Sequence, residues 1–205
     1  MDLIAKVNEL KGSSVSKIVD SKIKSFSNLG KKGNEAWFSE LCFCILTSNS
    51  KAQTAINIQN ELGYVGFATF TKEQLSESIR RNKHRFHNNK SDFIILAREY
   101  IDIKSRLKKE RDPRAWLVRN IKGIAWKESS PFLRNVGYTD YAILDRHIIN
   151  LLHEMGYLKE KPKTLNEKTY LKIELVFKKL ASDLNLNCSE LDLYMWNIKT
   201  GTILK

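Results

Sequence analysis

The sequence predicts an all-α protein, and the spacing of its apolar residues and its composition both lead to that fold class. Apolar side chains recur every three or four residues, as they do along one face of a helix. Such stripes are formed by Trp37, Leu41 and Ile45, by Phe93, Ala97, Tyr100 and the stem of Lys104, and by Tyr170, Ile173, Phe177 and Leu180. The 205 residues include only nine glycines and three prolines, and alternating runs typical of strands are scarce. We therefore expect amphipathic helices packed on one another.

Glycine, proline and charged residues predict where these helices begin and end. Residues 28–33 should break the chain before the Trp37 helix, and residues 63–66 should break it after the next one. Asp112-Pro113 should open a helix with proline near its first turn, and Gly137 should cap a helix that starts near Lys127. Residues 159–163 resemble a basic loop.

Bulk composition limits the classes of partner and cofactor. Thirty-five basic and twenty-three acidic residues give a net charge of +12, which suits a polyanion such as DNA, although a solvated basic surface would explain the charge about as well. There is no apolar run long enough for a membrane span and no secretory pattern, so we expect a cytoplasmic, intracellular protein without membrane contact. The three cysteines, Cys42, Cys44 and Cys188, predict neither a disulfide framework nor a four-cysteine iron–sulfur cluster.

Residues 116–147 hold the most informative motif. A short helix ending near Asn120, a tight turn at residues 122–125 and a new helix from Trp126 or Lys127 form a helix–hairpin–helix, with Ile121 and Ile124 turned inward. The amides of such a turn and of the following helix start can hold a DNA phosphate without reading sequence. Gly123 would let the backbone approach that phosphate closely. An ordinary helical connection containing a glycine is the alternative at this point.

Lys127 and Asp145 add reactive chemistry to this hairpin. A lysine at the start of a helix experiences a dipole that disfavours its positive charge, and burial would act in the same direction, so the neutral amine could serve as a nucleophile. Asp145 stands where an N-cap would stand for a helix spanning residues 146–152. An amine that attacks C1′ and a carboxylate that stabilises an oxocarbenium-like sugar are the groups needed to displace a base from DNA.

This segment resembles the helix–hairpin–helix DNA glycosylase superfamily, and most of all the archaeal-type, second-class 8-oxoguanine DNA glycosylase/lyases. The resemblance lies in Ile-Lys-Gly-Ile-Ala-Trp-Lys at residues 121–127, Phe-Leu-Arg-Asn-Val-Gly at 132–137 and Leu-Asp-Arg-His at 144–147, with further matches at 45–50, 85–88 and 192–205. It implies a two-lobed fold with the active site in the cleft between the lobes. The chain would be one catalytic unit, with approximate lobes at 34–137 and at 1–33 plus 138–205.

The resemblance also implies roles for individual residues. Lys127 would be the Schiff-base nucleophile and Asp145 its partner carboxylate. The main-chain carboxylate of Lys205 would recognise 8-oxoguanine, because the oxidised base carries an N7–H donor where guanine has an acceptor. Trp196 and Phe86 would stack on the flipped base, and Asp192 could accept from its Watson–Crick edge.

DNA contacts are implied at the hairpin, through Lys122, Gly123 and Ala125, and at Asn49, which would fill the gap left by the flipped base. Ala125 departs from the family pattern, because a second hairpin glycine is usual there. This departure bears on how well the turn can bind a phosphate. Pro131 removes an amide early in the second helix, at small cost if it lies in the first turn. The expected partner is double-stranded DNA containing 8-oxoguanine and the expected state is a monomer. No cofactor is expected, although the hairpin carbonyls could hold a monovalent cation.

Two other functions fit parts of the sequence. A non-enzymatic helix–hairpin–helix DNA-binding module would explain the charge and the hairpin. It would not explain the pairing of Lys127 with Asp145, or the apolar and aromatic residues at 191–196 near the C-terminus. A sibling glycosylase for another damaged base would share the fold. The missing cluster cysteines disfavour its iron–sulfur members, and Lys127 disfavours a purely monofunctional one.

Overall fold

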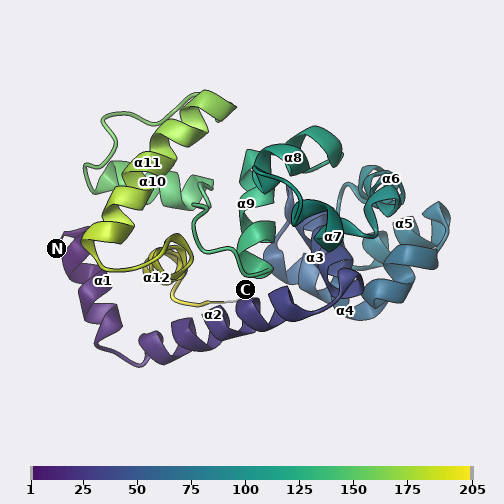
Figure 1. The fold of residues 1–205 in the computed structure, drawn as a ribbon, viewed down its shortest axis with the longest axis horizontal. Coiled ribbons are helices and arrows are strands. Elements are labelled where there is room, and N and C mark those ends of the chain that lie inside the picture. Colours follow the sequence, from purple (N-terminus) through teal and green to yellow (C-terminus); the bar gives the residue numbers. More distant parts are fainter. Residues whose placement is uncertain (1, 204–205) are drawn as a thin grey trace. The chain divides into compact units, whose positions relative to one another are not determined.

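The computed structural model describes residues 2–203, and these residues form helices joined by short loops (Figure 1). No strand occurs within this range, so the expected all-α class is confirmed. The helices are α1 (Leu3–Lys11), α2 (Val15–Lys31), α3 (Asn34–Thr47), α4 (Ala52–Thr69), α5 (Lys72–Arg81), α6 (His87–Ala97), the 3₁₀ helix η1 (Arg98–Tyr100), α7 (Ile103–Leu107), α8 (Pro113–Asn120), α9 (Trp126–Asn135), α10 (Arg146–Glu154), α11 (Glu167–Asp183) and α12 (Cys188–Thr200).

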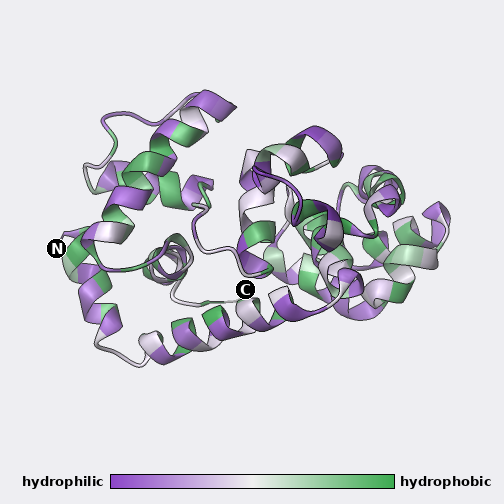
Figure 2. Ribbon diagram, in the orientation of Figure 1, coloured by the Kyte–Doolittle hydropathy of each residue, from purple (hydrophilic) through white to green (hydrophobic). Residues whose placement is uncertain are grey.

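The chain divides into two compact units. The first comprises residues 1–28 and 137–205, and the second comprises residues 29–136. Helix α2 contributes residues to both units, and along it polar and apolar residues alternate as in an amphipathic helix (Figure 2). Within residues 2–203, no helix combines the length and the apolar character that a membrane crossing needs.

Helix α3 is the centre of the second unit. It contacts α4, α6, α7 and α9, and Phe38, Leu41 and Ile45 on it are completely buried. A buried polar network also holds α9 in place. The Asn135 amide donates to Glu40 Oε1 of α3 at 2.6 Å, and the Arg134 guanidinium donates to Asn135 Oδ1 at 3.0 and 2.9 Å. These bonds satisfy groups that would otherwise be costly to bury, and they fix the helix that carries Lys127.

The first unit packs around α12, which contacts α1, α10 and α11. Tyr170 and Phe177 of α11 and Leu191 of α12 are completely buried. The apolar stripe expected at residues 170–180 therefore does face a core. The C-terminal segment is a regular helix up to Thr200, where Gly201 adopts a left-handed conformation (φ 73°) and ends it.

Two helix boundaries differ from the sequence expectation. Within the break expected at residues 28–33, α2 continues to Lys31 and the chain leaves the helix only at residues 32–33. The stripe from Phe93 to Lys104 is not one helix, because α6 ends at Ala97 and a 3₁₀ turn precedes α7. The break expected at residues 63–66 is present, since Gly63 (φ 54°, ψ −165°) has a non-helical backbone that kinks α4, and a second helical segment then runs on to Thr69.

Candidate active site

The expected hairpin is present in the second unit between α8 and α9. The amide of Ile121 bonds the Leu117 carbonyl at 2.9 Å and ends α8, and the amide of Ile124 bonds the Ile121 carbonyl at 3.2 Å and tightens the turn. Both isoleucines are buried, as predicted. Asp112 caps α8 by accepting from the Ala115 amide at 3.0 Å, with Pro113 in the first turn.

Gly123 is required by both its conformation and its surroundings. Its φ of +88° lies in the region that L side chains rarely adopt. A Cβ atom placed there would lie 2.5 Å from Cδ2 of Phe93 on α6, a distance that side chains do not tolerate. The ring of Phe93 therefore packs directly against the backbone of the turn, and glycine allows that approach.

Ala125 does not distort the hairpin. It has φ −104° and ψ −175°, which is extended backbone open to any residue, so the second hairpin glycine is not needed for conformation. Its methyl group cannot accept a hydrogen bond, and no side chain caps the start of α9. Lys122 and Ala125 are both exposed. The start of α9 thus combines an accessible turn with helix amides that no side chain caps.

Lys127 is the second residue of α9. Its side chain is 42% exposed, and its Nζ lies 3.1 Å from Oε1 of the buried Glu128, which is a nearby carboxylate that the sequence interpretation did not single out. The only sequence signal for Glu128 was an acidic residue in a first helical turn. Pro131 is the sixth residue of α9 and not part of its first turn. It therefore removes the amide that would bond the Lys127 carbonyl, and its cost is not small.

Asp145 is the N-cap of α10 in the first unit, as the sequence predicted. Its Oδ1 accepts from the Ile148 amide at 2.9 Å, while its backbone is extended. The segment before it is anchored on α11. Tyr170 Oη donates to the Ala142 carbonyl at 2.8 Å and accepts from the Leu144 amide at 3.1 Å, and a Glu174 oxygen accepts from the Ala142 amide at 2.9 Å. Two buried side chains, Tyr170 and Glu174, thus hold the segment that leads to Asp145 in place.

The base-recognition candidates of the first unit lie on α12. Asp192 is buried and Trp196, one turn later on the same face, is partly exposed. The Trp196 ring meets the ring of His147 edge to face at 5.4 Å, and His147 stands in the first turn of α10 after Asp145. The structure therefore brings Asp145, His147 and Trp196 into one neighbourhood. Lys205 lies outside the described residues.

The second unit holds Phe86 and Asn49. Phe86 precedes α6 and is 40% exposed, with the Arg85 guanidinium 5.3 Å from its ring centroid. Asn49 follows α3, is exposed, and has a left-handed φ of 60°, which asparagine tolerates better than most residues. Both are therefore presented on loops at the surface.

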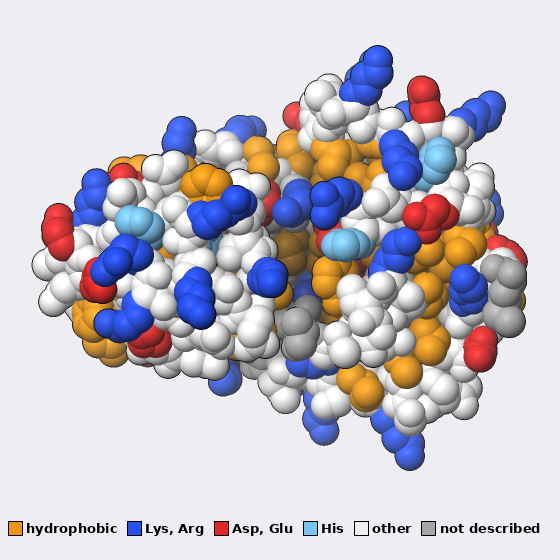
Figure 3. Space-filling model, turned by 180° about the vertical axis from the view of Figure 1, so that it is seen from behind, with side chains coloured by type: hydrophobic (Ala, Val, Ile, Leu, Met, Phe, Trp, Pro, Cys, Tyr) orange, Lys and Arg blue, Asp and Glu red, His pale blue; other side chains and the backbone are white. Residues whose placement is uncertain are grey.

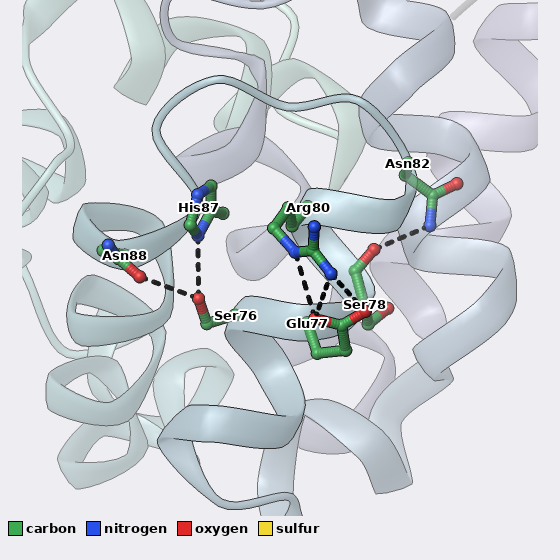
Figure 4. A network of polar contacts seen from close by, with 7 residues as sticks. All are labelled: Ser76, Glu77, Ser78, Arg80, Asn82, His87 and Asn88. Atoms are coloured by element: carbon green, nitrogen blue, oxygen red, sulfur yellow. Dashed lines mark hydrogen bonds and ion pairs between the residues drawn. The ribbon is translucent and has the colours of Figure 1, made fainter.

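Polar contacts join α5 to α6, and Asn82, the first residue of the loop between them, bonds the Ser78 carbonyl of α5 (Figure 4). The Ser76 hydroxyl lies 2.9 Å from both Nδ1 of His87 and Oδ1 of Asn88. Two cations of the basic run at residues 80–85 form exposed ion pairs: Arg80 pairs with Glu77 at 2.9 Å, and Arg81 pairs with Glu61. Lys and Arg side chains nevertheless predominate over acidic ones on the face in Figure 3.

Comparison with known proteins identifies the family. A family model described as 8-oxoguanine DNA glycosylase matches residues 19–186. The chain is 48% identical to an 8-oxoguanine DNA glycosylase/AP lyase of Methanocaldococcus jannaschii over the full length of both chains. It is 39% identical to that of Aquifex aeolicus, over 93% of this chain and 94% of the relative.

The chain belongs to the 8-oxoguanine DNA glycosylase family. A crystal structure of the Methanocaldococcus jannaschii glycosylase/lyase in complex with a 15mer DNA containing 8-oxoguanine superposes with a TM-score of 0.96 and 47% identity, covering 99% of each chain. The glycosylase of Thermotoga maritima superposes with a TM-score of 0.93 and 35% identity, over 99% of this chain and 98% of that one. The helix–hairpin–helix glycosylase fold inferred from residues 116–147 is therefore confirmed.

Proposed function

We propose that this protein is a bifunctional DNA glycosylase/AP lyase that excises 8-oxoguanine from double-stranded DNA and then cleaves the strand by β-elimination. The observation that carries the proposal is the full-length similarity to 8-oxoguanine DNA glycosylase/AP lyases, one of them solved with lesion-bearing DNA. The positions of Lys127, directly after a hairpin suited to phosphate, and of Asp145 support the same chemistry.

Lys127 is the proposed nucleophile. Its Nζ attacks C1′ of the damaged nucleotide, the C1′–N9 bond breaks, and the bonding electrons leave with the base, which is then protonated. Asp145 stabilises the positive charge that develops on the sugar and accepts a proton from the amine. Opening of the sugar ring gives an imine between Nζ and C1′. The imine acidifies the C2′ proton, and the loss of that proton expels the 3′ phosphate.

Recognition of the base is assigned to the aromatic and acidic candidates. Trp196 and Phe86 would stack on the flipped base, and Asp192 and the main-chain carboxylate of Lys205 would accept hydrogen bonds from its edges. Lys122, Gly123 and Ala125 would hold a phosphate at the hairpin. Asn49 would occupy the gap in the duplex. Because lysine supplies the nucleophile, no cofactor is required, while a monovalent cation at the hairpin stays a prediction.

Borohydride trapping tests the proposal directly. With wild-type protein and duplex DNA containing 8-oxoguanine, reduction of the imine should give a covalent protein–DNA adduct. Lys127→Gln should form none, and its excision rate should fall by a factor on the order of 10⁴ or more, since a nucleophile has been removed. Lys172→Gln is the control, because it removes an exposed lysine charge on α11 to which no role in the reaction is assigned.

Two results would contradict the proposal. A wild-type protein that binds the duplex but forms neither adduct nor free base would be a DNA-binding module. Excision of another damaged base with 8-oxoguanine left intact would make it a sibling glycosylase. We further expect a monomer that acts in the cytoplasm, where the DNA of its prokaryotic relatives lies.

A further inference from the structure

We infer that His84 is a positioning residue, which couples the loop carrying Asn49 to the backbone of Phe86 through the two nitrogens of one imidazole. The inference rests on the proposed function, because it concerns two residues assigned there to the flipped base and to the gap it leaves. His84 itself touches neither base nor sugar in this scheme. It acts through the two loops that do.

The geometry places His84 between the two loops. His84 is buried, with only 2% of its surface exposed. Its Nε2 lies 2.9 Å from the Leu46 carbonyl oxygen at the end of α3, three residues before Asn49. Its Nδ1 lies 3.2 Å from the Phe86 amide nitrogen, and the His84 and Phe86 rings meet edge to face at 6.4 Å.

The chemistry of the two partners dictates a single protonation state for the ring. A carbonyl oxygen can only accept, so Nε2 must carry a hydrogen and donate it to Leu46. An amide N–H can only donate, so Nδ1 must be the acceptor for Phe86. Only the neutral ring with hydrogen on Nε2 satisfies both. Burial lowers the pKa of His84, as do the charges of Lys90, His87 and Arg85, while the Leu46 carbonyl acts in the opposite direction.

The bond from His84 to Leu46 is one of four hydrogen bonds that satisfy the last carbonyls of α3. The last four carbonyls of a helix lack helical partners, and here each finds another. Thr47 Oγ1 donates to Cys44 at 2.8 Å, Lys90 Nζ to Ile45 at 2.6 Å, His84 Nε2 to Leu46 at 2.9 Å and the Ser50 amide to Thr47 at 3.2 Å. The loop that presents Asn49 therefore departs from a fixed helix end, and His84 is the group that links this end to Phe86.

Two substitutions each remove one of the two hydrogen bonds of His84 and keep the other. In His84→Gln, the side-chain amide can reach the position of Nε2 and donate to Leu46, but it leaves no acceptor at Nδ1 for the Phe86 amide. In His84→Asn, the carbonyl oxygen takes the position of Nδ1 and can accept from Phe86, but nothing reaches Leu46. Each variant thus serves as the control for the other.

The readout is single-turnover excision of 8-oxoguanine from duplex and from single-stranded DNA. Base stacking is needed on both substrates, so His84→Gln should slow both by about tenfold. Gap filling is needed only in a duplex, so His84→Asn should slow duplex excision by a similar factor and leave single-stranded excision within about twofold of wild type. Cleavage of a preformed abasic single strand, which has no base to stack, should stay near wild type for both.

These outcomes distinguish the inference from the proposed function. If wild-type protein excises 8-oxoguanine and both variants match it on every substrate, the inference fails while the function stands. The inference also fails if both variants lose excision equally on the two substrates, because His84 would then be only a core residue. If the wild type excises nothing, the proposed function itself fails.

A measurement on the wild type keeps the inference testable even if neither variant folds. Nitrogen-15 NMR of the histidine side chains distinguishes the two neutral tautomers from the charged ring. At pH 7, His84 should show a protonated Nε2 and an unprotonated Nδ1. A charged ring, or a hydrogen on Nδ1, would overturn the inference because the Phe86 amide would then face a donor.

Discussion

The starts of α9 and α10 carry the two residues assigned to the chemistry, and they differ in capping: a side chain caps α10, and none caps α9. Helix α10 begins with its own acceptor, since Asp145 Oδ1 takes the Ile148 amide at 2.9 Å. Helix α9 follows Ala125, which has no acceptor, and no side chain caps it. Side-chain caps are typically worth about 1 kcal/mol of stability, so α9 lacks a stabilisation that α10 has.

The difference matches the assigned tasks. A capping side chain at α9 would occupy the amides that a hairpin offers to a DNA phosphate, and an acidic cap would also repel that phosphate. At α10 the cap is itself the assigned catalytic carboxylate. The helix amide and the dipole at this helix start hold Asp145 in one orientation as an acceptor. One helix start therefore has no side-chain cap, and the other is capped by the carboxylate that is assigned to the reaction.

The largest expected effect separates capping from catalysis at Asp145. Asparagine caps helices as well as aspartate does, but it carries no charge. Asp145→Asn should therefore slow excision by about 10²–10⁴-fold, while the unfolding free energy stays within about 0.5 kcal/mol of wild type. Asp145→Ala should lose the same activity and a further 1 kcal/mol or so of stability. Single-turnover kinetics and urea unfolding measure the two quantities.

Asn166 provides a matched control for this comparison. It caps α11 in the same unit by accepting from the Thr169 amide at 3.0 Å, and it has no assigned role in the reaction. Asn166→Ala should therefore cost about 1 kcal/mol of stability with little change in excision. If Asp145→Asn retained wild-type excision, Asp145 would be only a cap.

The next largest effect concerns Lys90, whose buried amine donates to the Ile45 carbonyl at the C-terminal end of α3. Burial lowers the pKa of Lys90 from 10.5 to about 8, with Glu128 opposing and Lys127 adding to the shift. Between pH 8 and 10.5 the unfolded chain holds a proton that the folded chain has released. The unfolding free energy attributable to this group should therefore rise with pH over that interval, by up to about 3 kcal/mol.

Lys90→Met isolates this contribution. Its side chain has a similar length but does not titrate, so the difference in unfolding free energy between wild type and variant should change across pH 8–10.5 and be constant below pH 7.5. Chemical denaturation at several pH values measures it. Parallel curves for the two proteins over the whole range would show that Lys90 keeps an ordinary pKa.

The substitution Gly123→Ala should have the next largest effect. The substitution forces an L residue to φ +88° and sets its Cβ 2.5 Å from Phe93, which together should cost about 2 kcal/mol of stability. Because the hairpin turn moves, affinity for DNA should fall to a similar degree for damaged and undamaged duplexes. Gly156→Ala is the control, since Gly156 also has a positive φ of 80° but nothing within 4 Å of its Cβ position. Equal losses at both glycines would mean that backbone strain alone accounts for the cost.

Local patterns were sufficient for much of this architecture. The hairpin, the inward Ile121 and Ile124, the Asp145 cap and the Gly137 terminator (φ 98°) all follow from residues within one or two turns of each other. Capping and turn chemistry act over that short range, so they can be predicted from the sequence alone. The apolar stripes of α3 and α11 were predictable for the same reason.

The contacts that the sequence did not predict join residues far apart in the chain. Nothing near residue 84 indicates that His84 bonds Leu46, and nothing near Lys90 indicates that its amine bonds Ile45. Likewise, nothing near residue 81 indicates that Arg81 pairs with Glu61, twenty residues earlier in the chain. Such pairings depend on which helices pack together, and apolar periodicity does not specify that.

The smallest expected effect tests the open helix start directly. Ala125 already has the extended backbone of an N-cap, so Ala125→Ser and Ala125→Asp should each cap α9 and raise the unfolding free energy by about 1 kcal/mol. Both should weaken DNA binding because a side chain now competes with phosphate for the helix amides. The loss should be larger for aspartate, since its charge also repels the phosphate, and that additional loss should shrink as salt is added. If both variants gained stability and bound DNA as wild type does, the uncapped start of α9 would not be a phosphate site, and the contrast with α10 would be one of stability alone.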